Sequence, residues 1–474
     1  MKRLFALFIS FFLVMSYTLT SCGDSKEKPS KTSNVSIKAS SGMKQTMEPT
    51  VTPTISDDPK VKVIRIASRN DERAGLIKKF EELHPDFPYR IEQVIYGGLM
   101  EYAPQLNGAL EDGGEAAPDI YLTDVTEVMK YTQGEYSSYA ATYKDLGFDV
   151  DELIKEADIA QYIADIGKRE DGNVVALSAS SDGGAFIYRR SIAIDVWGTD
   201  EPEVIKQKIG GTWENFFKAA EDLKKKGYSI VSGEGDVWNV VQNSANQGWV
   251  VDGKLVIDPK REAFLDISKK LQGNDYSNAT QIWQEDWFND MKDAGDKKVF
   301  GFFGPSWLVT DTLKINCGGE TPGQGTYGDW AVCEPTTPFF WGGTWIFANK
   351  NTKVPNAVGE LIKWMTLDTS ETGLQSLMAN GTLEEGNNKK IAVSSLSVME
   401  KSEDSIDFLS GQNMFEVFTP VSRLVNGKNV TQYDEKMNQY WKNEVRAYAD
   451  GTKTRKQAIQ DFKNTVKESL EITE

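Results

Sequence analysis

The sequence has little histidine, little cysteine and no excess of positive charge. Among 474 residues there are one His (His84) and three Cys, which excludes His-rich metal sites and a pair of catalytic imidazoles. Lys and Arg number 53 against 70 Asp and Glu, giving a formal net charge of −17. Nucleic acids and anionic membrane surfaces bind to basic proteins, so neither is expected as a direct partner. We expect no metal site, no cofactor and no catalytic residue.

Long apolar runs are also missing, except near the amino terminus. The residues at the amino terminus are typical of an export signal. Lys2 and Arg3 precede the apolar run of residues 4–15 (LFALFISFFLVM). A spanning helix needs about 20 apolar residues, so the run fits a secretory signal better. Residues 19–22 (LTSC) resemble a bacterial lipobox, which predicts a signal peptide over 1–21 and a lipid on Cys22. The alternative is a plain secretory signal with an incidental cysteine.

Residues 22–60 are rich in Ser, Thr, Lys and Pro and poor in apolar side chains. Such a segment buries too little surface to offset the entropy of ordering, so a flexible tether is expected. These features predict an extracytoplasmic domain held by a lipid at the outer face of a bacterial cytoplasmic membrane.

After the tether, β-type and helical patterns alternate. Residues 61–68 (VKVIRIAS), 89–95 and 119–122 have the composition of strands, with helical spacing between them. This order predicts a parallel sheet with right-handed crossovers, in which ligands bind beyond the carboxyl ends of the strands. The polar residues at those ends are Arg69, Asn70 and Asp124. Asn70 is also explained as a helix N-cap alone.

Several short motifs occur in a fixed order along the rest of the chain. They are residues 117–120 (APDI), 186–190 (FIYRR), 211–216 (GTWENF), 303–307 (FGPSW) and 339–345 (FFWGGTW). Together they resemble the extracellular solute-binding proteins of ABC importers, of the carbohydrate-binding, maltose-binding-protein-like family 1. The sequence departs from the family pattern at Ser178, where the family often has Pro.

The resemblance implies an α/β fold of two lobes, each a mainly parallel sheet flanked by helices, with the ligand cleft between them. We assign residues 61–180 and 297–345 to lobe 1, and residues 181–296 and 346–474 to lobe 2. The implied function is binding without chemistry: a monomer takes up a mono- or oligosaccharide and delivers it to the transmembrane subunits of an ABC permease.

Sugars present apolar C–H faces and hydroxyl groups, so their sites combine aromatic rings with closely placed polar side chains. We expect Trp238, Trp307 and Trp341 to be aromatic platforms, and Gly342 and Gly343 to let the backbone approach the ligand. The polar candidates are Arg69, Asn70, Asp124, Asp182 and Asn239. Core packing is the alternative for each Trp, and it is the interpretation adopted for Trp213, Trp283, Trp287, Trp364 and Trp441.

The remaining cysteines, Cys317 and Cys333, enclose a Gly-rich stretch and are expected to form a disulfide outside the cytoplasm. The alternative is two reduced thiols. Residues 323–328 satisfy G-x-G-x-x-G but lead into a strand, so they do not indicate dinucleotide binding. Two rival functions stay open: a secreted, lipid-anchored glycoside hydrolase, because carboxylates are abundant, and a passive surface adhesin.

Overall fold

The computed structural model describes residues 56–70, 74–98, 101–114, 117–384, 389–402 and 405–474. The secondary structure belongs to the unit Thr54–Glu474. The predicted signal peptide, Cys22 and most of the predicted tether lie outside the described residues. No helix within the described ranges is long and apolar enough to cross a membrane.

The first sheet has five strands in the order β2-β1-β3-β10-β4. They are β1 (Val63–Ser68), β2 (Arg90–Ile95), β3 (Ile120–Asp124), β4 (Ala176–Ser178) and β10 (Thr344–Ala348). β1 pairs in parallel with β2 and β3, as predicted, whereas β10 runs antiparallel to β3 and β4. Ile64, Ile66 and Ala67 are all buried, because helices cover this sheet on both sides.

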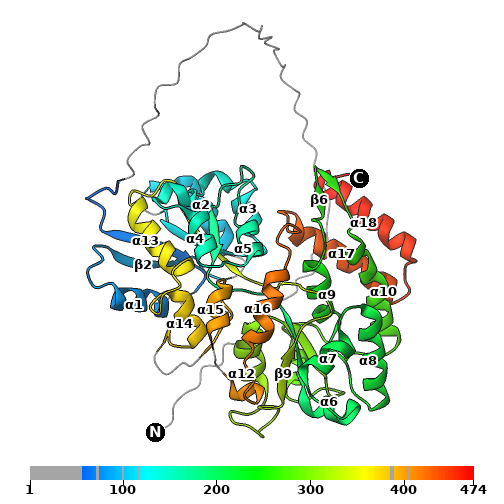
Figure 1. Ribbon diagram of the computed structural model, residues 1–474. Helices are drawn as coiled ribbons and strands as arrows, with labels where there is room; N and C mark the ends of the chain where they lie inside the picture. Colours follow the sequence, from blue (N-terminus) through cyan, green and yellow to red (C-terminus); the bar gives the residue numbers. More distant parts are fainter. Residues whose placement is uncertain (1–55, 71–73, 99–100, 115–116, 385–388, 403–404) are drawn as a thin grey trace, which may run out of the picture. The chain divides into compact units, whose positions relative to one another are not determined.

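The helices around this sheet come from two distant parts of the chain. They are α1 (Ala74–Leu83), α2 (Tyr102–Asp112), α3 (Val128–Thr132), α4 (Val150–Glu156), α5 (Gln161–Ile166), α13 (Pro355–Thr366), α14 (Leu374–Asn380) and α15 (Leu396–Lys401), with 3₁₀ turns at Ser137–Tyr139 and Tyr143–Leu146. In Figure 1 the yellow α13 and α14 lie beside the blue α1. Contacts among Phe80, His84 and Trp364 join them: the rings of Phe80 and His84 stack at 4.2 Å, and that of Phe80 meets Trp364 at 5.1 Å.

The second sheet has three antiparallel strands in the order β8-β5-β9. They are β5 (Ala185–Arg189), β8 (Gly301–Gly304) and β9 (Trp330–Cys333), and a separate hairpin is formed by β6 (Val250–Val251) and β7 (Lys254–Leu255). Side chains alternate across β5: Phe186 and Tyr188 belong to one apolar core, and Ile187 belongs to the other.

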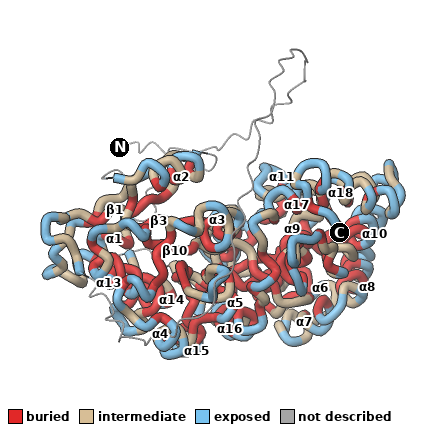
Figure 2. The backbone as a smooth tube through the Cα atoms, turned by 90° about the horizontal axis from the view of Figure 1, so that it is seen from above, coloured by how far each residue is buried: buried red, intermediate tan, exposed pale blue. Residues whose placement is uncertain are grey.

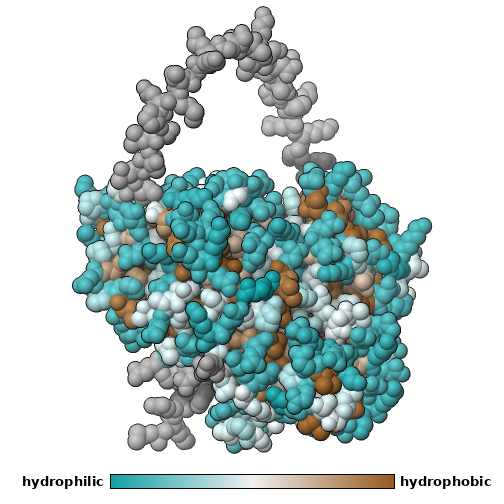
Figure 3. All heavy atoms as spheres, viewed as in Figure 1, coloured by the Kyte–Doolittle hydropathy of each residue, from teal (hydrophilic) through white to brown (hydrophobic). Residues whose placement is uncertain are grey.

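Two groups of helices flank the second sheet. One group is α6 (Arg190–Trp197), α7 (Pro202–Ile209), α8 (Trp213–Lys225), α9 (Glu234–Asn243), α10 (Pro259–Gly273), α17 (Asp434–Ala449) and α18 (Arg455–Leu470). The other is α11 (Glu285–Met291), the π-helix η5 (Leu308–Leu313), α12 (Lys314–Asn316), the 3₁₀ turn η6 (Asp407–Leu409) and α16 (Phe415–Leu424). Figure 2 shows the buried segments inside both sheet regions, with exposed helices outside them. Figure 3 shows a largely hydrophilic face, which agrees with the acidic composition.

The sheets are mixed or antiparallel, so the expectation of mainly parallel sheets is corrected while the two-lobe α/β fold is confirmed. The expected lobe boundaries stay a prediction, but strand pairing differs from them in two places. Residues 297–345 were expected in lobe 1, yet β8 and β9 pair with β5. Residues 346–474 were expected in lobe 2, yet α13 to α15 contribute to the core around the first sheet. The apolar run of residues 299–303 (VFGFF) would fit either sheet, because its hydrophobic pattern does not indicate which strands it pairs with.

Two adjacent segments cross between the sheets. Residues 179–184 connect β4 to β5, and residues 334–343 lead from β9 back to β10. They are joined by hydrogen bonds from Trp341 N to Asp182 O (2.9 Å) and from Gly184 N to Phe339 O (2.9 Å). The segment around Ala392 lies against the first crossing segment, because Ser181 N donates to Ala392 O (3.0 Å). The Ser/Gly-rich segment 179–184 therefore crosses between the two sheets.

The predicted disulfide is wrong. Cys317 and Cys333 are both free and buried, and they belong to different apolar cores. Cys317 Sγ approaches the carbonyl oxygens of Lys314 (3.1 Å) and Gly319 (3.2 Å), whereas Cys333 lies in β9 opposite Phe186. Burial raises the pKa of both thiols, which disfavours the thiolate.

Candidate ligand-binding site

The carboxyl-terminal edge of the first sheet holds an Arg–Asp pair. Arg69 follows β1 and Asp124 ends β3, and Arg69 Nη1 lies 2.5 Å from Asp124 Oδ2. Asp124 Oδ1 accepts from the backbone N–H of Thr126 (2.9 Å), and the Arg69 guanidinium lies 5.6 Å from the centre of the Tyr102 ring. Each side chain of the pair is about a quarter exposed, so both can still reach a ligand. Because parallel strands end at one edge, this juxtaposition is the one that the sequence predicted.

Asn70 lies beside this pair in the chain and is exposed. Its backbone carbonyl accepts from Ser68 Oγ (2.8 Å) and from Gln93 Nε2 (2.6 Å). Residues 71–73 are outside the described residues, so both the ligand role and the N-cap role of Asn70 stay predictions.

Three tryptophans gather near the crossing segments. The ring centres of Trp307 and Trp341 are 4.9 Å apart with the planes at 60°, and Trp283 lies 6.0–6.1 Å from both. Trp283 and Trp307 are nearly parallel, at 15°. Trp307 and Trp341 are partly buried, whereas Trp283 is 47% exposed. The three rings form the Trp cluster, which offers the flat apolar surface expected for Trp307 and Trp341.

The assignment of Trp283 to the core is therefore wrong. Trp283 sits in a turn before α11 with a left-handed φ of +68°, and this backbone directs its ring toward Trp307 and Trp341. Neither periodicity nor composition reveals a positive φ at a Trp. The other core assignments hold for Trp287, Trp364 and Trp441, which are nearly fully buried, and Trp213 is partly buried against the second core.

Gly342 and Gly343 connect the Trp cluster to the sheet edge. Their φ values are +96° and +109°, a region that favours glycine. A Cβ on Gly343 would lie 2.7 Å from the Trp345 ring and 3.2 Å from Asp182 Oδ2. Gly343 O accepts from Val125 N (3.1 Å), immediately after Asp124. The double glycine thus brings the Trp cluster, Asp182 and the Arg69–Asp124 pair into one region.

Asp182 is a buried carboxyl at the centre of the crossing. Its backbone N–H donates to Tyr162 Oη (2.8 Å), and Ser180 Oγ donates to its Oδ2 (3.1 Å). Burial raises the pKa of Asp182 to about 7, and hydrogen bonds from Ser180 and Trp307 oppose that rise. Near neutral pH this carboxyl can therefore act as a donor or as an acceptor toward a hydroxyl group.

Trp238 and Asn239 are on α9 in the second lobe. They line a cavity of about 590 Å³ that is also bounded by Trp283 and Trp341. Trp238 is 3% exposed and packs on Phe264 at 4.8 Å, so it forms a wall of the cavity rather than an open platform.

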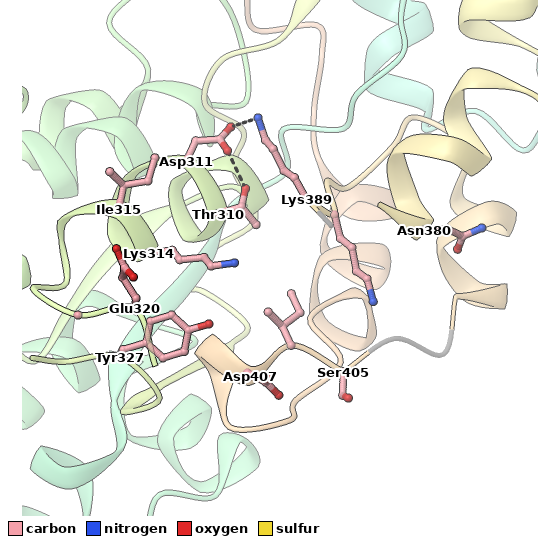
Figure 4. A pocket seen from close by; sticks show the side chains of 13 residues that line it. Thr310, Asp311, Lys314, Ile315, Glu320, Tyr327, Asn380, Lys389, Ser405 and Asp407 are labelled. Atoms are coloured by element: carbon pink, nitrogen blue, oxygen red, sulfur yellow. Dashed lines mark hydrogen bonds and ion pairs between the residues drawn. The ribbon is translucent and has the colours of Figure 1, made fainter. Parts of the chain in front are cut away.

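Two further cavities lie beside η5. Ser178, Ser180 and Thr344 face Asp311 and Ile315 across a cavity of about 610 Å³, which adjoins another of about 1030 Å³. Figure 4 shows Asp311 and Lys389 meeting at the wall of the larger cavity, with Nζ and Oδ2 2.7 Å apart. Ile391, two residues after Lys389, donates to Met378 O of α14 (3.2 Å), so this ion pair joins the two lobes.

Comparison with known proteins agrees with this arrangement. Residues 75–381 match the family model of bacterial extracellular solute-binding proteins. The chain belongs to this family. Its members are binding proteins found outside the cell, and within the described ranges no cluster of three or more His, Cys, Asp or Glu could hold a metal ion. We found no match among curated proteins.

Solved structures share the fold at low sequence identity. An extracellular solute-binding protein of family 1 has a TM-score of 0.69 at 16% identity, covering 85% of this chain and 98% of its own. The galacto-N-biose/lacto-N-biose I-binding protein of the Bifidobacterium longum ABC transporter, in complex with lacto-N-biose, has a TM-score of 0.64 at 15% identity, with coverage of 88% and 98%. A maltose-bound protein of T. maritima has a TM-score of 0.59 at 16% identity, with coverage of 86% and 99%.

Proposed function

We propose that this solute-binding protein captures a sugar or oligosaccharide between its lobes and delivers it unaltered to the permease of an ABC importer. The observation that carries the proposal is the Trp cluster, which lies against the double glycine beside the buried carboxyl of Asp182. Solved relatives described with lacto-N-biose and with maltose support a sugar as the solute.

The chemistry of these residues suits a carbohydrate. Indole rings cover the C–H face of a pyranose, while Asp182 and the Arg69–Asp124 pair hydrogen-bond to its hydroxyl groups. A buried hydroxyl without a partner costs about 1–3 kcal/mol, so the polar groups near the Trp cluster favour a polyol over an apolar ligand. Asn70, Gly342 and Gly343 complete the proposed contacts.

Delivery requires that ligand binding favours a closed form. A ligand shifts this balance only by its differential affinity for the two forms, so contacts from both lobes are needed. The first lobe provides Arg69 and Asp124, and the second provides Trp307 and Trp283. We further propose that the protein works as a monomer, tethered by a lipid on Cys22.

A thermal-shift screen of the mature protein against mono- and oligosaccharides tests the proposal. A ligand at 100 times its Kd should stabilise the fold by about 2.7 kcal/mol. Chromatography of the same mixtures should recover the sugar intact, whereas cleaved products would favour the hydrolase alternative. No stabilisation by any sugar would overturn the proposal.

The anchor has its own test. Metabolic labelling with a fatty acid should mark the wild-type protein, and Cys22→Ala should remove the label and release the protein from the membrane fraction. Labelling that persists in Cys22→Ala would contradict lipidation at this residue.

A further inference from the structure

The cavity of about 590 Å³ in the second lobe extends behind the Trp cluster. It lies among α9, α10, α17 and the loop 277–283, and Trp283 and Trp341 are among the residues that line it. Its volume is in the range of sites for small molecules. Because two rings of the Trp cluster belong to its wall, a sugar on the cluster would reach into it.

Two cations of α17 line this cavity one helical turn apart. Arg446 Nε lies 2.7 Å from Glu234 Oε1, so the charge of Arg446 is already paired. The side chain of Lys442 is half-buried, and its ammonium group forms no ion pair or hydrogen bond with any other described residue. Burial and the nearby Arg446 lower the pKa of Lys442, while Glu234 opposes that change. The positive charges of Lys442 and Arg446 repel each other because they lie one turn apart. An anion beside Lys442 would offset this repulsion.

The same wall holds two buried N–H donors without acceptors. Trp238 and Asn239 are 3% and 9% exposed, and neither Trp238 Nε1 nor Asn239 Nδ2 has a hydrogen-bond partner among the described residues. An unmet buried donor is costly and uncommon in folded proteins. Both residues line the cavity, but both nitrogens are closed off from solvent, so an acceptor would reach them only after the side chains shift.

The two carboxylates that line the cavity already accept hydrogen bonds. Glu234 accepts from Arg446 and from Ser268 Oγ (2.7 Å), and Asp450 accepts from Thr452 N (2.9 Å) and Oγ1 (2.8 Å). Lys442 is therefore the lining cation available to a ligand. A cation and two aromatic rings are complementary to a sugar that carries a negative charge, and a shift of the α9 side chains would add two donors.

We propose that this cavity binds an anionic substituent, a carboxylate or a sulfate, of a sugar held on the Trp cluster. The inference rests on the proposed function and narrows it to acidic glycans. The acidic group would pair with Lys442, while the sugar ring lies against Trp283 and Trp341.

Calorimetry with matched ligands tests this site. Digalacturonate and trigalacturonate are compared with their methyl esters, which keep the rings but remove the charge, and chondroitin disaccharides are compared with and without sulfate. The acid should bind about tenfold or more tightly than its ester, because a hydrogen bond to a charged group is about twice as strong as one to a neutral group. A preference in the first pair identifies a carboxylate, and one in the second pair identifies a sulfate.

Variants on one helix separate the site from general charge effects. Lys442→Gln should abolish the preference for the charged ligand, Lys442→Arg should retain much of it, and Lys436→Gln, at an exposed position of α17, should leave it unchanged. Circular-dichroism melting checks that each variant is folded.

Equal affinity for charged and neutral ligands, or a preference that survives Lys442→Gln, would overturn the inference. If neutral sugars still bind in a Trp307-dependent manner, the proposed function stands without it. If no sugar of any kind binds, both fail.

Discussion

At the scale of single residues, the buried carboxyls link the site to pH. Burial raises the pKa of Asp182 and of Asp236 from 3.8 to about 7 in the folded protein. Between about pH 4 and 7 the folded state therefore binds more protons than the unfolded state, and stability falls as pH rises.

We expect Asp182→Asn to flatten part of this decline, because the amide carries no charge to bury. The difference in unfolding free energy between pH 5 and pH 8 should shrink by on the order of 1–4 kcal/mol. Urea unfolding at both pH values measures it, with Asp252→Asn, in an exposed turn, as the control. Identical pH profiles for wild type and Asp182→Asn would contradict the prediction.

Trp283 gives a second prediction at this scale. Its ring is half exposed, so Trp283→Ala should change the unfolding free energy by less than about 1 kcal/mol. Loss of a stacking face should nevertheless weaken sugar binding by about tenfold. Trp287→Ala is the contrast, since this fully buried ring should cost about 3–5 kcal/mol. If Trp283→Ala instead lost much stability and kept its affinity for sugar, Trp283 would have a structural role in the core and not a role in binding.

At the scale of elements, the turn before β10 determines the geometry of the site. Gly343→Ala adds a Cβ 2.7 Å from the Trp345 ring at a φ of +109°, whereas Gly253→Ala meets a positive φ of +76° with no atom within 4 Å. We expect Gly253→Ala to cost about 1–2 kcal/mol and Gly343→Ala to cost more. Only Gly343→Ala should also weaken sugar binding. If the two variants lost equal stability and Gly343→Ala kept its affinity for sugar, the turn before β10 would not determine the geometry of the site.

Local patterns predicted these elements well where one period dominates. β1, β2 and β3 begin and end within two residues of expectation. The convergence of Arg69 with Asp124 followed from strand polarity alone. Trp283 and the antiparallel β10 were missed because each depends on backbone direction, which side-chain pattern does not encode.

At the scale of the whole folded domain, the arrangement of the lobes depends on partners distant in the chain. The pairing of β5 with β8 and β9 joins residues more than a hundred positions apart, and no local signal identifies the partner. Order of motifs indicated two lobes, but it could not divide the strands between them.

The Asp311–Lys389 pair leads to a prediction about lobe closure. Both side chains are about one-third exposed, so the pair contributes no more than about 1 kcal/mol. Lys389→Gln should barely change the melting temperature but shift the balance between open and closed forms. Small-angle scattering should show a smaller radius of gyration with saturating sugar, and the sugar-free Lys389→Gln protein should be more expanded than wild type. A radius unaffected by sugar would exclude closure.

The two unbonded thiols have a practical consequence. Because Cys317 and Cys333 are buried in separate cores, no oxidant or isomerase has to act before the domain reaches its native state. A maleimide dye added to the intact domain should react only as these cores open, so the rate of labelling would time each opening without an engineered probe.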